Sequence, residues 1–208
     1  MNRTLAVVAA LVAGLAVACS TAGGATTAPS ASAGSGCPTA QPEPLPAGES
    51  RIVTVETSEG DIEITVVADL SPIAVGNFVA LAECGYYDGV VFHRIVPGFV
   101  IQGGDPTGTG TGGPGYTIQD EPVTTDYARG TVAMARTPAP NSVGSQFFIV
   151  LDDAAAQSLA DPSANNYQIL GSVTDGMDAV DAIAAAADDE SPSDPVEMDR
   201  VVVTQVTE

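Results

Sequence analysis

The 208-residue sequence contains no Lys, no Trp and a single His, and its six basic residues are all Arg. Against these stand 26 acidic residues, which give a formal net charge of −20. Nucleic acids and anionic membrane surfaces are bound mainly through basic side chains. The charge balance therefore argues against nucleic acid as a partner and against direct contact with a lipid surface.

The shortage of His and Cys narrows the possible chemistry. A Ser-His-Asp hydrolase would have to use His93, and the sequence has no GxSxG motif. No His/Cys cluster has the spacing of metal ligands, so we expect no metal and no cofactor. Gly108–Gly113 reads GTGTGG and satisfies GxGxxG, but Pro114 and Gly115 follow it in place of a helix, which argues against a nucleotide site.

The N-terminus has the pattern of an export signal. A short charged start, Met1–Thr4, precedes the apolar run Leu5–Ala18, which is too short to span a bilayer. The run ends in LAVAC, where small residues precede Cys19, and this resembles the lipobox of lipoproteins. We expect residues 1–18 to be a signal peptide and Cys19 to carry lipid; the alternative is an ordinary secretory signal cut nearby. In both cases we expect export, to the outer face of the cytoplasmic membrane or beyond it.

Residues 19–48 consist mainly of Ala, Ser, Thr, Gly and Pro. Such a segment buries too little apolar surface to offset its ordering entropy, so we expect a disordered tether before one folded domain at 49–208. Three Cys is an odd number for an exported protein. With Cys19 modified by lipid, Cys37 and Cys84 could form a disulfide, or they could remain two free thiols.

The domain sequence alternates short apolar strands with turn residues and has few helical segments. Ser71-Pro72 predicts the N-cap and first residue of a helix that ends near Cys84, and Asp175 can cap a second helix, Met177–Ala187. The period-2 and β-branched runs predict eight strands, at 51–57, 60–67, 90–96, 99–102, 130–135, 146–151, 168–173 and 196–206. We therefore expect a mainly β protein in which a closed barrel removes exposed sheet edges, with residues 106–127 as a long functional loop.

Two stretches stand out because they place polar groups among apolar and aromatic residues. Val91–Asp105 reads VFHRIVPGFVIQGGD, and Met134–Val150 reads MARTPAPNSVGSQFFIV. In the first, Arg94 lies among apolar neighbours, where a charge is costly unless it is paired or used. Together the two stretches resemble the signature blocks of cyclophilins, which are peptidyl-prolyl cis-trans isomerases. The resemblance implies a closed eight-stranded antiparallel β-barrel capped by two α-helices.

The resemblance also implies roles for particular residues. Arg94 matches the catalytic Arg, and Gln102 matches the Gln that holds the substrate and supports that Arg. The residues that match the substrate-binding positions are Phe99, Val100, Ala135, Arg136, Gln146, Phe148, Leu159 and Tyr167. Val100 stands where Met is common, Arg136 stands where many members have Asn, and Leu159 and Tyr167 align only with an insertion. The alternatives are an ion pair for Arg94, barrel core for the apolar residues and a turn cap for Gln146.

The implied activity is rotation about the bond before proline, and the implied substrates are proline-containing unfolded or flexible polypeptides. That bond is well populated in cis, yet rotation crosses a barrier of about 18–20 kcal/mol. The twisted amide exposes a nitrogen lone pair that the planar forms lack, so a donor such as Arg94 would bind it preferentially, without covalent chemistry. We expect a monomeric isomerase of exported proteins that meets the membrane only through its lipid. The alternative is a proline-peptide-binding chaperone or adaptor with little turnover.

Overall fold

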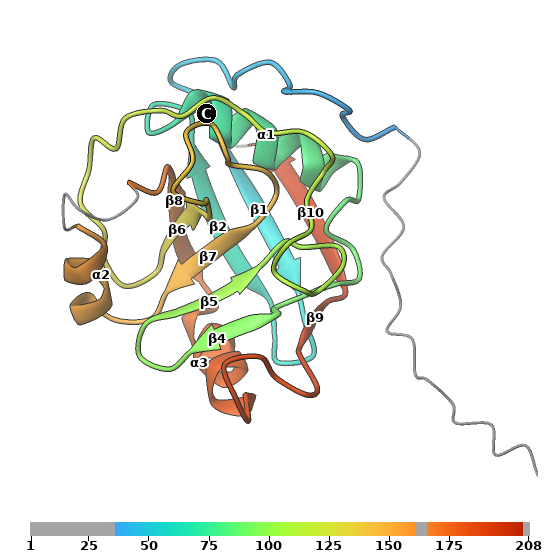
Figure 1. Cartoon of the computed structure of the whole chain (residues 1–208), viewed down its shortest axis with the longest axis vertical. Coiled ribbons are helices and arrows are strands. Elements are labelled where there is room, and N and C mark those ends of the chain that lie inside the picture. The colour runs from blue at the N-terminus through green and yellow to red at the C-terminus, as the bar shows by residue number, and fades with distance from the viewer. Residues whose placement is uncertain (1–35, 161–165, 206–208) are drawn as a thin grey trace, which may run out of the picture.

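The computed structural model describes residues 36–160 and 166–205. Its main feature is one strongly curled antiparallel sheet of eight strands (Figure 1). The strands in order across the sheet are β10 (Arg200–Gln205), β1 (Ser50–Glu56), β2 (Ile62–Val67), β8 (Ile169–Asp175), β6 (Thr131–Met134), β7 (Phe147–Val150), β5 (Val100–Gly103) and β4 (Arg94–Val96). A second sheet pairs β3 (Val90–Val91) with β9 (Glu197–Met198).

The mainly β fold is confirmed, but the sheet is not closed by a strand pair. In the part of the chain that is described, β10 and β4 are the two edges of the main sheet. The segment before β9 covers the β4 edge instead, because the Ile95 N–H donates to the Glu190 carbonyl at 2.8 Å. The strands expected at 90–96 and 196–206 are each interrupted, at Phe92-His93 and at Asp199. These breaks produce the separate β3–β9 pair.

Three helices are described, one more than expected. The helix α1 (Pro72–Glu83) begins after Ser71 as predicted, although the Ser71 side chain makes no capping hydrogen bond. Instead the Glu121 carboxylate, from the long loop, accepts from the N–H groups of Ile73 at 2.8 Å and Ala74 at 2.9 Å. That loop therefore fixes the start of a helix far away in the sequence.

The other two helices differ from the prediction in their starts. The helix α3 (Met177–Ala186) has Gly176 as its N-cap, with a φ of 84° that favours glycine, so the expectation that Asp175 caps it is wrong. The helix α2 (Asp153–Leu159) was not predicted. Its N-cap is Asp152, whose side chain accepts from the Ala155 N–H at 2.8 Å.

The segment 36–48, expected to be part of the tether, packs on α1. Leu45 is 8% exposed, and its N–H donates to the Pro72 carbonyl at 3.0 Å. Cys37 is joined to Cys84 by a disulfide at the end of α1. The ordered domain therefore starts before residue 49. The expected signal peptide at 1–18 and Cys19 lie outside the described residues, and none of the described helices has the length and apolar character needed to cross a membrane.

Two apolar clusters lie on opposite faces of the sheet. The larger cluster includes Phe147, whose ring packs edge-on against Phe78 of α1 with centroids 5.2 Å apart. Adjacent side chains on a strand point to opposite faces, so Phe148 belongs to the smaller cluster, with Val100, Ala133 and α2. The smaller cluster forms the floor of the site.

Candidate active site

A cavity of about 110 Å³ opens over the smaller apolar cluster. Nine of the ten residues predicted to act on substrate line it: Arg94, Phe99, Val100, Gln102, Ala135, Arg136, Phe148, Leu159 and Tyr167. The tenth, Gln146, lies beside it and hydrogen-bonds to Gln102. The structure thus brings the predicted residues together from three strands (β4, β5 and β7), the helix α2 and the segments next to them.

The floor of this cavity is apolar and fixed by packing. Val100, Phe148 and Leu159 are each buried. The Tyr167 ring stands at 90° to the Phe148 ring with centroids 5.2 Å apart, and the Tyr127 hydroxyl donates to the Tyr167 carbonyl at 2.8 Å. Edge-to-face packing is a favourable aromatic geometry, so these contacts help to hold Tyr167 at the edge of the cavity.

Arg94 forms the polar side of the cavity. It is the direct cross-strand partner of Gln102 in the β4–β5 pair, which places the two side chains next to each other. The Arg94 Nη1 group donates to Gln102 Oε1 at 3.5 Å, and Nε donates to Glu190 Oε1 at 2.7 Å. Glu190 is the last of three consecutive acidic residues, Asp188–Glu190, and no sequence motif links it to Arg94.

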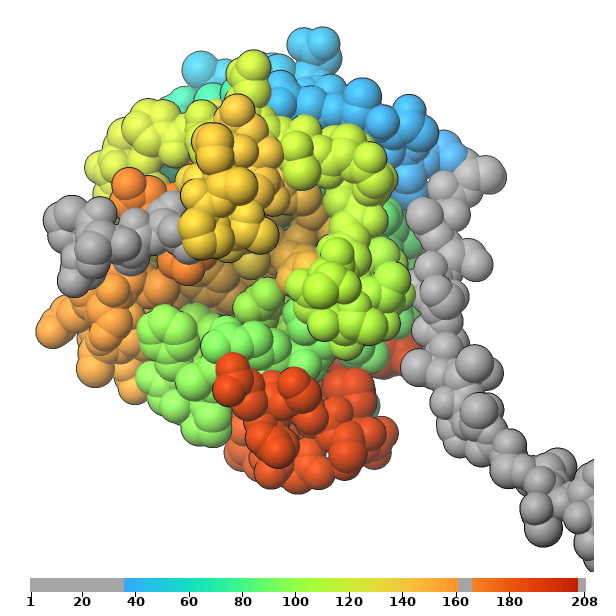
Figure 2. All heavy atoms as spheres, viewed as in Figure 1, coloured from blue at the N-terminus to red at the C-terminus, as the bar shows by residue number. Residues whose placement is uncertain are grey.

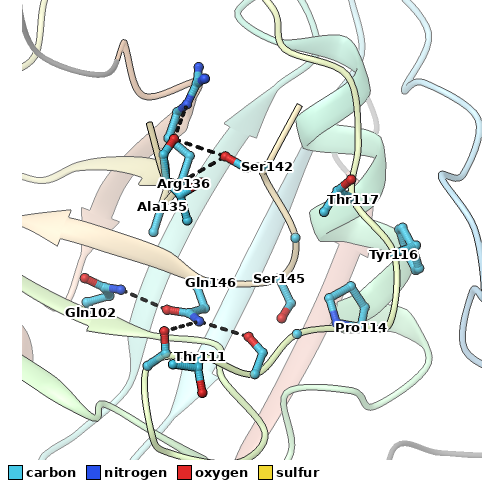
Figure 3. Close-up of a pocket in the computed structure, with 15 residues that line it drawn as sticks. Gln102, Thr111, Pro114, Tyr116, Thr117, Ala135, Arg136, Ser142, Ser145 and Gln146 are labelled. Carbon is cyan, nitrogen blue, oxygen red and sulfur yellow. Dashed lines mark hydrogen bonds between the residues drawn. The ribbon is translucent and has the colours of Figure 1, made fainter. Parts of the chain in front are cut away.

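The side-chain amides of Gln102 and Gln146 connect Arg94 to the long loop, and Figure 3 shows the part of this chain from Gln102 onward. The Gln146 Nε2 group donates to the carbonyl oxygens of Gly110 at 3.1 Å and Gly112 at 2.9 Å. Because carbonyls only accept, Gln146 must turn its oxygen to Gln102, which donates to it at 2.9 Å. Gln102 then has its own oxygen free for Arg94. The loop carbonyls thus set the direction of both amides.

The loop itself is folded around the buried carboxylate of Asp105, which is 1% exposed. Asp105 accepts from the N–H groups of Thr107 at 2.7 Å, Thr109 at 3.2 Å and Gly112 at 2.9 Å. Burial acts to raise the pKa of Asp105, but the hydrogen bonds from Gly112 and Thr107 outweigh it, and the pKa is lowered. Two N–H groups of the GTGTGG motif, those of Thr109 and Gly112, thus bind an internal carboxylate.

Arg136 directs its charge away from this network. Its guanidinium donates to Asp120 Oδ2 and to the Ala139 carbonyl, both at 3.1 Å, and it points away from Gln102 and Gln146 in Figure 3. The residue still borders a second, larger cavity of about 420 Å³, which shares Gln102 and Ala135 with the first. Figure 2 shows the hollow between the loop after β5 (yellow-green), the loop after β6 (yellow) and the strands β4 and β5 (green).

His93 does not take part in the site. Its side chain is buried, and neither ring nitrogen has a hydrogen-bond partner among the described residues. Burial is the main cause that lowers its pKa below 6.5, so the ring is neutral at pH 7. Within residues 36–160 and 166–205, no group of three or more His, Cys, Asp or Glu side chains could hold a metal ion.

The sequence matches the family model described as cyclophilin type peptidyl-prolyl cis-trans isomerase over residues 52–206. The peptidyl-prolyl cis-trans isomerase A of Mycobacterium tuberculosis is 38% identical over 173 residues, which cover 73% of this chain and 91% of that protein. The chain spans 22% to 26% of the length of several longer curated relatives, such as the spliceosome-associated protein CWC27 homolog of Danio rerio, 45% identical over 129 residues.

Solved structures agree with the sequence matches. The crystal structure of a cyclophilin type peptidyl-prolyl cis-trans isomerase of Cryptosporidium parvum has a TM-score of 0.68 and 33% identity, covering 76% of this chain and 99% of that one. A crystal structure of that protein in the presence of the dipeptide Ala-Pro has a TM-score of 0.66 and 34% identity, covering 74% of this chain and 98% of that one. This chain belongs to the cyclophilin-type peptidyl-prolyl cis-trans isomerases, and it is by class an isomerase.

Proposed function

We propose that this chain accelerates rotation about X-Pro bonds in polypeptides, with Arg94 stabilising the twisted amide. One observation supports this above all: the Arg94 guanidinium and the Phe148 ring line the same small cavity. The apolar floor suits a proline ring, and the cation at the side of the same cavity offers a donor for the prolyl nitrogen. Neither feature alone would favour the twisted form over the two planar forms.

The chemistry follows from the loss of amide resonance in the transition state. Twisting localises a lone pair on the prolyl nitrogen, and a charged donor stabilises that lone pair more than it stabilises a planar amide. A rate acceleration of about 10⁵ corresponds to about 7 kcal/mol. One charge-assisted hydrogen bond in a partly dehydrated site, together with a grip on the flanking backbone, is of that size. No nucleophile or proton transfer is needed.

The proposed substrates are flexible proline-containing chains. The relative from Cryptosporidium parvum was crystallised in the presence of Ala-Pro, which supports the same ligand chemistry for this cavity. The proposed place of action is outside the cytoplasmic membrane, with the chain anchored by lipid at Cys19 or secreted. Support for this comes from the N-terminal sequence pattern, and slow prolyl isomerisation is a step that exported chains meet when they fold.

A protease-coupled assay on an Ala-Pro peptide tests the mechanism. We expect Arg94→Ala to lower kcat/KM about 100-fold, because it removes the donor that acts in the transition state. The matched control is Arg200→Ala, which removes an exposed Arg of β10 outside both cavities and leaves the rate unchanged. Equal rates for wild type and Arg94→Ala would disprove the mechanism, and peptide binding without any acceleration by wild type would favour the chaperone or adaptor alternative.

A further inference from the structure

We infer that Glu190 is a positioning residue for Arg94: it orients the guanidinium so that its remaining donors face the substrate. This rests on the proposed function of Arg94. The contact between the Arg94 Nε group and Glu190 Oε1 is 2.7 Å long, shorter than the 3.5 Å contact of Nη1 with Gln102. Glu190 is thus the closer of the two partners of this guanidinium.

The loop that carries Glu190 is itself attached to the strand that carries Arg94. The Glu190 carbonyl accepts from the Ile95 N–H at 2.8 Å, and farther along the Val196 carbonyl accepts from the Phe92 N–H at 2.9 Å. Figure 2 shows this loop (red) lying directly against β4 (green). The backbone of Glu190 is therefore held against Ile95, the residue next to Arg94, and this places the Glu190 carboxylate within reach of the Arg94 guanidinium.

Hydrogen bonds within the loop restrict it further. The Asp188 carboxylate accepts from both the N–H group of Ser193, at 3.0 Å, and its hydroxyl, at 2.7 Å, which closes the loop on itself. The Glu190 N–H donates to Asp189 Oδ1 at 2.6 Å. These bonds limit how far Glu190 can move, although its side chain is exposed.

The two partners leave a defined part of the guanidinium for substrate. Arg carries five N–H donors in a rigid plane. Glu190 takes the Nε donor and Gln102 accepts from Nη1, which fixes the plane and leaves Nη2 without a partner among the described residues. Arg94 is 38% exposed on its side chain, so without Glu190 the guanidinium would be free to turn into solvent. Small errors in donor position have large effects on rate.

This role differs from that of an ordinary surface ion pair. Exposed ion pairs add little to stability, and the backbone bond from Ile95 to Glu190 does not depend on the side chain. Truncating Glu190 should therefore leave the thermal midpoint of unfolding almost unchanged. Its effect should appear in turnover of the bound peptide and not in binding, because the orientation of Arg94 matters most in the transition state.

The test compares Glu190→Ala and Glu190→Gln, each with Arg94 present and with Arg94→Ala, in the mature protein. Exchange NMR on an Ala-Pro peptide gives the dissociation constant and the rate of cis-trans exchange on the enzyme. We expect Glu190→Ala to slow exchange about fivefold with a dissociation constant within about twofold of wild type. Glu190→Gln should recover most of the rate, since its amide oxygen still accepts from Nε. With Arg94→Ala, Glu190→Ala should have no further effect.

The matched control is Asp194→Asn, which removes one charge from the same loop at an exposed residue with no side-chain hydrogen bond among those described. It should exchange the peptide at the wild-type rate. The Arg94 Nε–H signal in ¹⁵N NMR reports the pair without any substrate, and its protection from exchange with water should be lost in Glu190→Ala. The inference would be overturned if Glu190→Ala exchanged the cis and trans peptide at the wild-type rate. It would also be overturned if Glu190→Ala lowered that rate by the same factor with Arg94 present and with Arg94→Ala. An Arg94→Ala protein as active as wild type would instead show that the proposed function fails.

Discussion

Gln146 acts through the direction of its amide group, because its nitrogen and its oxygen face different neighbours. Glu has the same shape but no N–H, so Gln146→Glu would set a carboxylate against the carbonyls of Gly110 and Gly112, which can only accept. We expect this change to lower kcat/KM about tenfold while the protein stays folded. The coupled peptide assay and a urea unfolding curve measure the two effects.

Gln119→Glu is the control for this prediction. Gln119 is an exposed residue of the same long loop, and no hydrogen bond of its side chain is recorded in the described part of the chain. The Gln119→Glu variant gains the same charge without contacting the Gln102 and Gln146 amides, so it should keep wild-type activity. Full activity in Gln146→Glu would mean that the direction of the amides has no influence on Arg94.

Seven of the nine residues that line the cavity could be predicted because they lie in two contiguous motifs, whereas Leu159 and Tyr167 lie outside both. Arg94 and Gln102 are also paired by a short hairpin, whose Pro97-Gly98 turn is visible in the sequence. Glu190 could not be found in this way. It lies 96 positions from Arg94 in a run of acidic residues, and only the folded sheet selects one of them as a partner. Motifs thus predict residues that are local in sequence but not their distant partners.

At the scale of elements, α2 supplies Leu159 to the floor of the cavity and has a single capping side chain. Asp152 accepts from the Ala155 N–H, and an N-cap of this type contributes about 1 kcal/mol. We expect Asp152→Ala to destabilise the protein by about that amount. Peptide binding should weaken as well, because Leu159 at the other end of α2 lines the cavity.

Asp152→Asn is the matched control, since its side-chain oxygen still accepts the capping bond. Urea unfolding and peptide titration followed by NMR measure both quantities. The prediction is contradicted if Ala and Asn at this position give the same stability and the same dissociation constant.

The sequence predicted the strands better than their ends and the helices better than their caps. The helix α2 was overlooked because DAAAQSL is short and its alanines give no amphipathic period, although Asp152 before it is a cap signal. Barrel closure was overstated because residue patterns predict strands and not the pairing of the two outermost ones. The composition of residues 36–48 predicts a tether, yet Leu45 is buried in the core and Cys37 packs against the core.

At the scale of the whole molecule, the composition leaves few groups that titrate near neutral pH, because the charged side chains are 26 acidic residues, six Arg and a single His. Acidic side chains ordinarily titrate near pH 4, and Arg does not titrate at all in this range. The pKa of Tyr127 is raised to about 12, chiefly by burial, and the same cause raises the pKa of Tyr116 to about 12. His93, the single His, is therefore the side chain expected to change charge between pH 5 and 8.

Stability should fall on acidification for two reasons that act in different pH ranges. Burial lowers the pKa of His93, so below about pH 6.5 the unfolded chain binds a proton that the folded chain resists. The pKa of Asp105 is also lowered, because the hydrogen bonds that it accepts outweigh its burial. Its contribution to stability is present above its ordinary value of 3.8 and is lost as the pH falls through its folded pKa.

Activity should behave differently, because the proposed mechanism depends on a guanidinium group and such groups do not titrate in this pH range. We expect the free energy of unfolding, from urea curves, to decrease between pH 7.5 and 5, while kcat/KM of the folded protein stays nearly flat from about pH 6 to 9. A bell-shaped activity profile would assign the chemistry to a titrating group and not to a guanidinium. Few carboxylates titrate between pH 7.5 and 5, so little charge repulsion should be relieved in that interval. Stability that rises between pH 7.5 and 5 would contradict the prediction, because relief of charge repulsion would then outweigh the cost of protonating His93.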